Sequence, residues 1–312
     1  MTVAVLSSLI RPLVEPRLPD GIEARWFMSK EEALELAPEA EIGWFDFQQP
    51  EPMVEVARAA TRLRWLNSIY AGLDFLPLDI LAERGVVVTN GAGINAITIA
   101  EYTVMLMLAH AKGYRDVVRA QDRHEWLQDS PGKRELAGSK ALLLGYGAIG
   151  KLVERRLSAF DAEVTVVRRS PGPGTLGPDE WRDRLGEFDW IILAVPATPE
   201  TEGMIGAEEL AAMKREAVLV NIARGTVVDQ DALVEALRTK RIEAALLDVT
   251  DPEPLPQDHP LWSLENAQVT MHLSGRAQTL MFKRSADRFI ENLARWQAGE
   301  PVSPQMDLRL GY

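Results

Sequence analysis

Residues 141–160, ALLLGYGAIGKLVERRLSAF, decide the fold of the chain. An apolar run precedes the motif Gly145-Tyr146-Gly147-Ala148-Ile149-Gly150, and a helix-like segment follows it. This order is typical of a strand–turn–helix unit that binds a dinucleotide, because glycines permit the tight turn and the close approach of a pyrophosphate to the helix N-terminus. The alternative interpretation is a purely structural strand–helix turn.

The residues after the next predicted strand indicate which dinucleotide is bound. That strand should end near the adenosine ribose, where an NAD-binding protein usually places an acidic residue. This chain has Arg168, Arg169 and Ser170 there. Guanidinium groups form charge-assisted hydrogen bonds to phosphate oxygens, so we predict that NADP is preferred and that NAD is possible. The alternative is a solvated pair of surface arginines.

Short apolar runs alternate with helix-like segments on both sides of the glycine motif. This alternation predicts an α/β fold with doubly wound parallel sheets, in which strands are buried on both faces. Long helices are expected over 97–118 and 278–296, and the polar stretch 122–139 is expected to link two lobes. Strands are expected at 2–8, 21–27, 42–47, 64–70, 85–90, 141–145, 162–167, 190–195, 217–222, 243–249 and 268–271.

Length, charge and composition narrow the class of protein. A chain of 312 residues is long enough for two domains. A net charge of -12 argues against nucleic acid as the main partner, and the apolar run 97–111 is too short to span a membrane and contains Glu101. The chain has no cysteine, which fits a reducing compartment. We therefore expect a cytoplasmic protein with neither a nucleic-acid nor a membrane partner.

Three later segments place polar residues at the ends of apolar strands, where a doubly wound fold collects its ligand-binding groups. They are 221–225, NIARG; 247–254, LDVTDPEP; and 271–275, MHLSG. Arg224 can hold a substrate carboxylate and polarise a carbonyl, while His272 can exchange a proton with its oxygen. Glu253 beside that histidine would favour the imidazolium form. Taken singly, each residue could also be a surface charge, a turn residue or a strand-end histidine.

With YAGLDFL at 70–76, IAEYTVMLML at 99–108 and PATPET at 196–201, these motifs resemble the D-isomer-specific 2-hydroxyacid dehydrogenase family. That family includes glyoxylate/hydroxypyruvate reductases, D-lactate dehydrogenases and phosphoglycerate dehydrogenases. The resemblance implies a Rossmann cofactor domain, 98–280, inserted in a flavodoxin-like substrate domain, 1–97 with 281–312. It also implies that 97–111 contributes to a homodimer interface.

The same resemblance assigns roles to individual residues. Arg224, Glu253 and His272 would form the active site, and Asp248 would bond the nicotinamide carboxamide. Backbone amides of Tyr70-Ala71-Gly72 would hold the substrate carboxylate together with Arg224. No metal site is expected. The cofactor would lie along Gly145, Gly147, Ala148, Ile149, Gly150, Arg168, Arg169, Ser170, Val195, Pro196, Thr201, Ile222, Ala223 and Asp248.

Some residues depart from the family pattern. Tyr70 stands where the family often has a small residue, Met271 stands where it commonly has proline before the histidine, and Arg276 is also unusual. Four aromatic residues are expected either in the core or around a pocket for a larger substrate: Tyr70, Trp44, Phe45 and Phe47.

The predicted reaction is hydride transfer between NADP(H) and C2 of a small 2-keto or 2-hydroxy acid such as glyoxylate or hydroxypyruvate. Two alternatives stay open. One is a reductase of a bulkier aryl or branched 2-keto acid. The other is a non-catalytic dinucleotide sensor or corepressor-like protein on the same fold.

Overall fold

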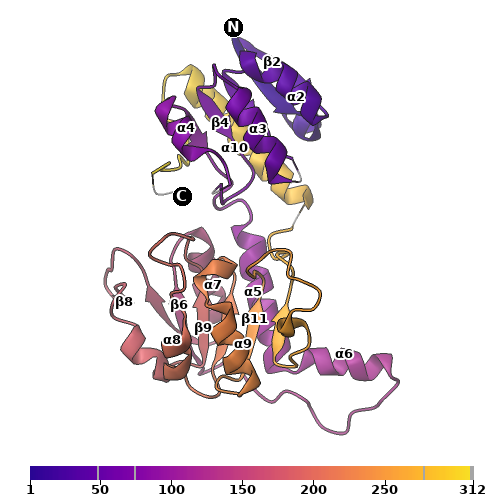
Figure 1. Cartoon of the computed structure of the whole chain (residues 1–312), viewed down its shortest axis with the longest axis vertical. Coiled ribbons are helices and arrows are strands. Elements are labelled where there is room, and N and C mark those ends of the chain that lie inside the picture. Colours follow the sequence, from indigo (N-terminus) through magenta and orange to yellow (C-terminus); the bar gives the residue numbers. More distant parts are fainter. Residues whose placement is uncertain (48, 74, 277, 310–312) are drawn as a thin grey trace. The chain divides into compact units, whose positions relative to one another are not determined.

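The computed structural model describes residues 1–47, 49–73, 75–276 and 278–309. The chain forms two compact units, Met1–Asn95 with Arg276–Tyr312 and Ala96–Gly275 (Figure 1). Each unit contains one sheet with helices around it, which confirms the predicted α/β class. The stretch 122–139 was wrongly expected to link two lobes, because it lies inside the second unit.

The second unit is built on a seven-stranded sheet in the order β12-β11-β10-β9-β6-β7-β8, and every neighbouring pair is parallel. This is the doubly wound order of a dinucleotide-binding fold, with the reversal of strand order between β6 and β9. Its strands are β6 Lys140–Leu144, β7 Glu163–Val167, β8 Thr175–Leu176, β9 Trp190–Leu193, β10 Val218–Asn221, β11 Ala244–Leu247 and β12 Ala267–Val269.

The central strands form because their sequences are apolar on both faces. All residues of β9, β10 and β11 are buried, as strands covered by helices on both sides must be. The short edge strand β8 was missed, because two residues carry no periodicity. The helices of this unit are α5 Ala96–Ala111, α6 Tyr114–Asp122, α7 Ala148–Ser158, α8 Ala207–Ala212 and α9 Gln230–Arg238.

The helix expected over 97–118 is two helices. Gly113, between α5 and α6, has a φ of 61°, a left-handed conformation that glycine adopts at little cost and that interrupts a right-handed helix. The chain changes direction there, and α6 extends away from the body of the second unit (Figure 1).

The first unit has a five-stranded parallel sheet in the order β2-β1-β3-β4-β5. This is the flavodoxin-like order, and its strand order reverses between β1 and β3. The strands are β1 Thr2–Ser7, β2 Ile22–Phe27, β3 Ile42–Trp44, β4 Trp65–Asn67 and β5 Val87–Thr89. The helices are α1 Arg11–Val14, α2 Lys30–Leu36, α3 Pro50–Ala59, α4 Leu78–Glu83 and α10 Gln278–Gln297.

The C-terminal helix α10 belongs to the first unit, although nearly 200 residues separate it from β5 (Figure 1). Phe289 is fully buried, and its ring lies 5.2 Å from that of Trp65 and 5.0 Å from that of Trp44. Burial of such large rings is a main source of core stability. The residues of α10 thus complete the core of the N-terminal sheet. The assignment of the two units to substrate and cofactor stays a prediction.

Among the described residues, no helix is long and apolar enough to cross a membrane.

Candidate active site

The three predicted catalytic residues follow three adjacent strands of the second unit. Arg224 comes after β10, Glu253 after β11 and His272 after β12, and these strands pair in parallel in that order. Parallel strands end at the same edge of a sheet, so the loops that carry the three side chains meet there. Gly225 permits the approach of two of these loops, because a Cβ at this position would lie 2.1 Å from the carbonyl group of Thr250.

His272 and Glu253 form a direct hydrogen bond. The Nδ1 atom of His272 lies 2.8 Å from Oε2 of Glu253, and both side chains are partly exposed, at 47% and 38%. A carboxylate can only accept, so Nδ1 carries the proton. The described chain offers no hydrogen-bond partner to Nε2, which leaves that nitrogen available to a substrate oxygen.

The charge state of Glu253 suits this pairing. Partial burial by itself would raise the pKa of Glu253, but the hydrogen bond with His272 and the charge of Arg224 lower it below its usual value. Its second oxygen accepts a hydrogen bond from the backbone amide of Thr250 at 3.1 Å. Glu253 is therefore ionised at neutral pH and fixed in orientation, as a group that positions an acid–base histidine must be.

The glycine motif forms the turn that the sequence predicts between β6 and α7. A Cβ at Gly145 would lie 2.4 Å from the carbonyl oxygen of Ala194, and one at Gly150 would lie 2.2 Å from that of Gly145. Both positions therefore require glycine. A Cβ at Gly147 would meet nothing within 4 Å, and Gly147 and Ala148 are exposed at the start of α7. Ile149 is half-buried beside them. This open, amide-lined helix N-terminus fits a pyrophosphate.

The side chains at the end of β7 are exposed beside this turn. Arg168, Arg169 and Ser170 are all exposed, and the guanidinium carbon of Arg168 lies 5.9 Å from the centre of the Tyr146 ring. The hydroxyl of Tyr146 donates to Glu154 at 2.6 Å, which fixes the ring against which Arg168 lies. The structure thus places a guanidinium at the strand end where the ribose of a dinucleotide would lie.

The remaining predicted cofactor residues lie in loops at the same edge of the sheet. The hydroxyl of Thr201 donates to the carbonyl of Pro196 at 2.7 Å and so shapes the loop after β9, in which Val195 is half-buried and Pro196 exposed. Ile222 and Ala223 are buried directly after β10. Asp248 is also buried, and its carboxylate accepts hydrogen bonds from the segment that carries His272.

In the first unit, the segment Tyr70-Ala71-Gly72 presents two free amides. The amide of Tyr70 donates to the hydroxyl of Ser68 at 3.1 Å, whereas those of Ala71 and Gly72 have no acceptor in the described chain. The structure therefore leaves two of the three predicted amides available for an anion.

Asp46, which the sequence analysis did not single out, holds this segment in place. Its carboxylate accepts hydrogen bonds from Ser68 Oγ at 2.6 Å, from the amide of Ile69 at 2.6 Å and from Trp44 Nε1 at 2.7 Å. Burial raises the pKa of Asp46 to about 6. The one signal in the sequence was an acidic residue at a strand end, in IGWFDF.

The aromatic residues near Asp46 divide between the two expected roles. Trp44 and Phe45 are each 1% exposed and belong to the core. Phe47 lines a pocket of about 590 Å³ in the first unit, and its carbonyl accepts a hydrogen bond from the Tyr70 hydroxyl at 2.6 Å. The pocket is lined by Ser7, Ser8, Leu9, Phe27, Met28, Asp46, Phe47, Gln49 and Pro52.

Among the described residues, no group of three or more His, Asp or Glu side chains could hold a metal ion.

A family model, curated relatives and solved structures match this chain. Residues 104–274 match the family model described as "D-isomer specific 2-hydroxyacid dehydrogenase, NAD binding domain". The chain is 36% identical over 263 residues to a glyoxylate reductase of Korarchaeum cryptofilum, covering 79% of this chain and 76% of that protein. It is 33% identical over 259 residues to a D-3-phosphoglycerate dehydrogenase of Methanocaldococcus jannaschii, covering 80% of this chain but spanning only 49% of that longer relative.

A solved structure shows similarity over nearly the whole chain. It is an NADPH-dependent glyoxylate/hydroxypyruvate reductase from Sinorhizobium meliloti in complex with NADP and malonate. The TM-score is 0.80 at 25% identity, with 99% of this chain and 98% of that chain covered.

Proposed function

The chain belongs to the D-isomer specific 2-hydroxyacid dehydrogenase family, whose members are NAD(P)-dependent enzymes acting on the CH–OH group of small hydroxy or keto acids. From this membership, which confirms the resemblance stated above, we propose that it is an NADP-preferring reductase of a small 2-keto acid such as glyoxylate or hydroxypyruvate. The observation that carries the proposal is the His272–Glu253 hydrogen bond, with Arg224 on the neighbouring strand end.

In the proposed mechanism, Arg224 binds the substrate carboxylate and polarises the C2 carbonyl. That the amides of Ala71 and Gly72 also bind this carboxylate stays a prediction from the resemblance. His272 donates the proton on Nε2 to the carbonyl oxygen as it becomes a hydroxyl, and Glu253 stabilises the imidazolium before the transfer. A dinucleotide held at the Gly145–Gly150 turn would supply the hydride to C2. In the opposite direction, His272 accepts the hydroxyl proton.

A panel of 2-keto acids assayed by NADPH oxidation tests this function directly. We expect turnover of glyoxylate and hydroxypyruvate. If no acid of the panel is turned over while NADPH still binds, the chain is instead a non-catalytic dinucleotide-binding protein. The His272–Glu253 pair argues against that alternative, because a sensor needs only the cofactor loops.

The proposed preference for NADPH depends on Arg168 and its neighbours. Charge-assisted hydrogen bonds to a 2′-phosphate, discounted for exposure, predict a preference in kcat/KM on the order of 10 to 10³-fold over NADH. Arg168→Asp should erase or reverse it while kcat at saturating cofactor changes little. Arg155→Asp, an equal charge change on the exposed side of α7, is the matched control and should keep the preference. Equal kcat/KM values for both cofactors in the unmodified enzyme would show that the arginines are only surface charge.

The pocket in the first unit favours a second candidate, a 2-keto acid with a bulkier substituent. Asp46 and Phe47 line this pocket and also bind the segment 68–70, so the pocket adjoins the proposed carboxylate amides within one unit. Its apolar wall suits an aryl or branched group. A higher kcat/KM for such acids than for glyoxylate would establish this alternative, and a lower value would support the smaller substrates.

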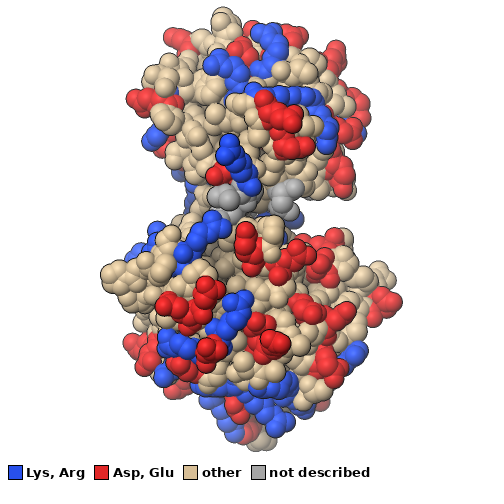
Figure 2. All heavy atoms as spheres, turned by 60° about the vertical axis from the view of Figure 1, so that its left-hand side comes forward, with Lys and Arg blue, Asp and Glu red and all other residues tan. Residues whose placement is uncertain are grey.

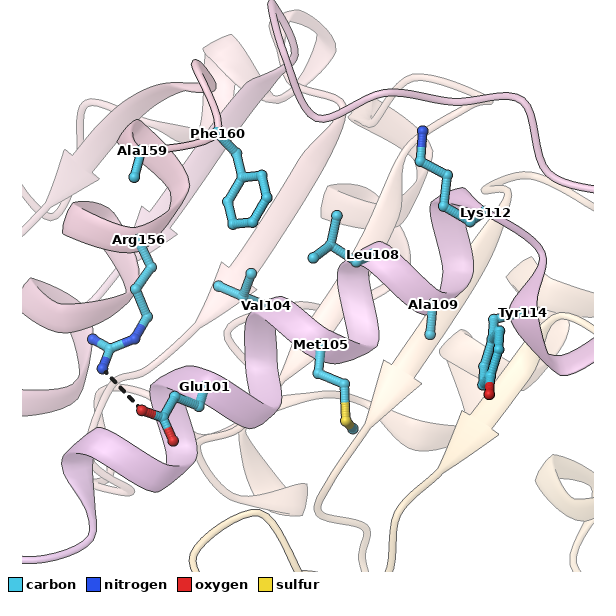
Figure 3. Close-up of a pocket in the computed structure, with 10 residues that line it drawn as sticks. All are labelled: Glu101, Val104, Met105, Leu108, Ala109, Lys112, Tyr114, Arg156, Ala159 and Phe160. Atoms are coloured by element: carbon cyan, nitrogen blue, oxygen red, sulfur yellow. Dashed lines mark ion pairs between the residues drawn. The ribbon is translucent and has the colours of Figure 1, made fainter.

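We also propose that the chain forms a homodimer through the exposed face of α5. An apolar groove of about 640 Å³ lies between α5 and α7, with Val104, Leu108 and Phe160 along it (Figure 3). Glu101 and Arg156 form an ion pair of 3.5 Å at its end. Trp126, beyond α6, is 88% exposed. Exposed apolar surfaces of this kind usually bind another protein.

Light scattering at micromolar concentration tests whether the chain is a homodimer. A mass near 34.7 kDa, that of one chain, would contradict the proposed dimer. Phe160→Lys should shift the mass towards that of one chain. Thr61→Lys, on an exposed turn of the first unit, is the control and should leave the mass unchanged.

The surface charge of each unit is mixed on the face shown in Figure 2, where acidic and basic side chains are interspersed. The expectation that nucleic acid is not a partner, like the cytoplasmic location, stays a prediction.

A further inference from the structure

The turn that carries His272 has an unusual backbone. Met271 has a φ of 54° and His272 a φ of 56°, so two consecutive non-glycine residues are left-handed. Such conformations persist only where surrounding contacts impose them. Proline, which the family commonly has at 271, could not adopt this φ, because its ring fixes φ near −65°. The turn of this chain therefore needs another source of rigidity.

Apolar packing does not provide that rigidity. The side chains of Met271 and Leu273 are 60% and 42% exposed, so neither is anchored in a core. The buried residues of this region are instead polar: Asp248 is 2% exposed and Ser274 is 3% exposed. Hydrogen bonds between these buried groups are the contacts that can hold the turn.

Asp248, directly after β11, binds the turn at several points. Its Oδ1 accepts hydrogen bonds from Thr270 Oγ1 at 2.7 Å and from the amides of Leu273 and Ser274 at 3.1 and 3.2 Å. Its Oδ2 accepts one from the hydroxyl of Ser274. The backbone carbonyl of Asp248 also accepts the amide of His272 at 2.6 Å. No Lys, Arg or His side chain of the described residues donates to this carboxylate.

We propose that Asp248 and Ser274 are positioning residues that hold the His272 turn, so that Nδ1 of His272 stays on Glu253 and Nε2 points to the substrate. This inference rests on the proposed function, in which His272 is the acid–base group. It differs from the role that the resemblance implies for Asp248, a hydrogen bond to the nicotinamide carboxamide. Oδ1 accepts three hydrogen bonds within the turn and Oδ2 accepts one, so Oδ2 keeps an acceptor position and the positioning role does not exclude that contact.

Ser274→Ala is the primary test, because it removes one hydroxyl and leaves Asp248 in place. We expect kcat for the 2-keto acid to fall by about 10-fold, as expected for the loss of one hydrogen bond to a charged group. The Kd for NADPH, measured by its fluorescence, should stay unchanged. Ser274→Thr keeps the hydroxyl and should recover most of kcat.

Combination with His272→Asn separates positioning from a general structural effect. If Ser274 acts through His272, then Ser274→Ala should lower kcat no further in the His272→Asn background. An equal fold-loss in both backgrounds would overturn the proposal for Ser274. For Asp248→Asn, a weaker Kd for NADPH with unchanged kcat would overturn the positioning role and establish the nicotinamide contact.

A spectroscopic measurement keeps this test independent of turnover. The chain has four histidines, so the ring nitrogens of His272 can be assigned in NMR spectra by comparison with His272→Asn. We expect Ser274→Ala to shift the Nδ1 resonance, because the bond to Glu253 is no longer held. An unchanged resonance would overturn the inference. Full activity of His272→Asn would instead reject the proposed function, whatever the spectra of Ser274→Ala show.

Discussion

The second unit contains two histidine–glutamate pairs of nearly the same geometry at opposite ends of one strand. Glu243 directly precedes β11 and lies 3.0 Å from His110 Nε2, whereas Glu253 follows β11 and lies 2.8 Å from His272 Nδ1. In both pairs the hydrogen bond lowers the pKa of the glutamate, although partial burial opposes it. Distance and charge alone therefore do not tell the two pairs apart.

The surroundings of the two pairs differ. At the amino end of the sheet, Arg134 binds the second oxygen of Glu243 at 2.7 Å, and the His110 and Trp190 rings are nearly perpendicular, with centroids 6.0 Å apart. The side chain of His110 is only 15% exposed. At the carboxyl end, His272 is 47% exposed and its second nitrogen has no partner in the described chain.

The comparison shows that position on the sheet, rather than the chemistry of the pair, indicates function. Ligands bind outside the carboxyl ends of strands in doubly wound folds, because the loops there are free to vary while the sheet holds them. The pair at the amino end is in contact with Arg134 and Trp190, and it joins α5 to the sheet. We therefore interpret His110–Glu243 as structural and His272–Glu253 as catalytic.

The largest difference in kcat is expected between the variants His272→Asn and His110→Asn. Loss of general acid–base catalysis should lower kcat of the first variant by about 10² to 10⁴-fold, while cofactor binding and folding are retained. The second variant should keep a kcat close to that of the unmodified enzyme and melt at a lower temperature. Steady-state kinetics and thermal denaturation of both measure this, and similar losses of kcat would show that the two pairs do not differ in function.

Arg224, near the carboxyl-end pair, and Arg134, in the amino-end pair, should also differ in their effect on catalysis, but by a smaller factor. Arg224→Ala removes a donor to the carboxylate and the developing charge, so kcat/KM should fall by about 10² to 10³-fold through both KM and kcat. Arg134→Ala should leave both kinetic constants nearly unchanged and reduce the free energy of unfolding by roughly 1 kcal/mol. A normal KM in Arg224→Ala would remove this residue from the substrate site.

Much of the fold could be predicted because its signals are local. The apolar runs of β9, β10 and β11 and the glycine motif lie within short segments whose sequence alone demands a buried strand or a tight turn. The break at Gly113 was missed because apolar residues continue on both sides of it. The role of 122–139 was misjudged because a polar stretch with proline and glycine is equally typical of a long loop inside a domain.

The candidate site could likewise be predicted only where its signals are local in the sequence. Arg224, Glu253 and His272 could be proposed from the sequence because each follows an apolar strand within a recognisable motif. The contacts of Asp46 with Ser68 and of Asp248 with Ser274 join residues 22 and 26 positions apart, and no sequence period connects them. Such contacts depend on how loops from different strands meet, which one sequence does not specify.

The smallest expected effect concerns the pH dependence of stability, and it tests whether His110–Glu243 is structural. The pKa of Glu243 is lowered in the folded state below its ordinary 4.5. A carboxylate of this kind stabilises the folded state above its unfolded pKa, and this contribution is lost as the pH falls through the folded pKa. Glu243→Gln should therefore lower the free energy of unfolding at pH 7, by about 1 kcal/mol after discounting for its 36% exposure, and by less near pH 4. Urea denaturation at both pH values measures the difference, with Glu35→Gln, on an exposed position of α2, as the control. Because the pair lies far along β11 from Glu253, kcat should not change; a loss of kcat at full stability would instead make the amino-end pair part of the functional site.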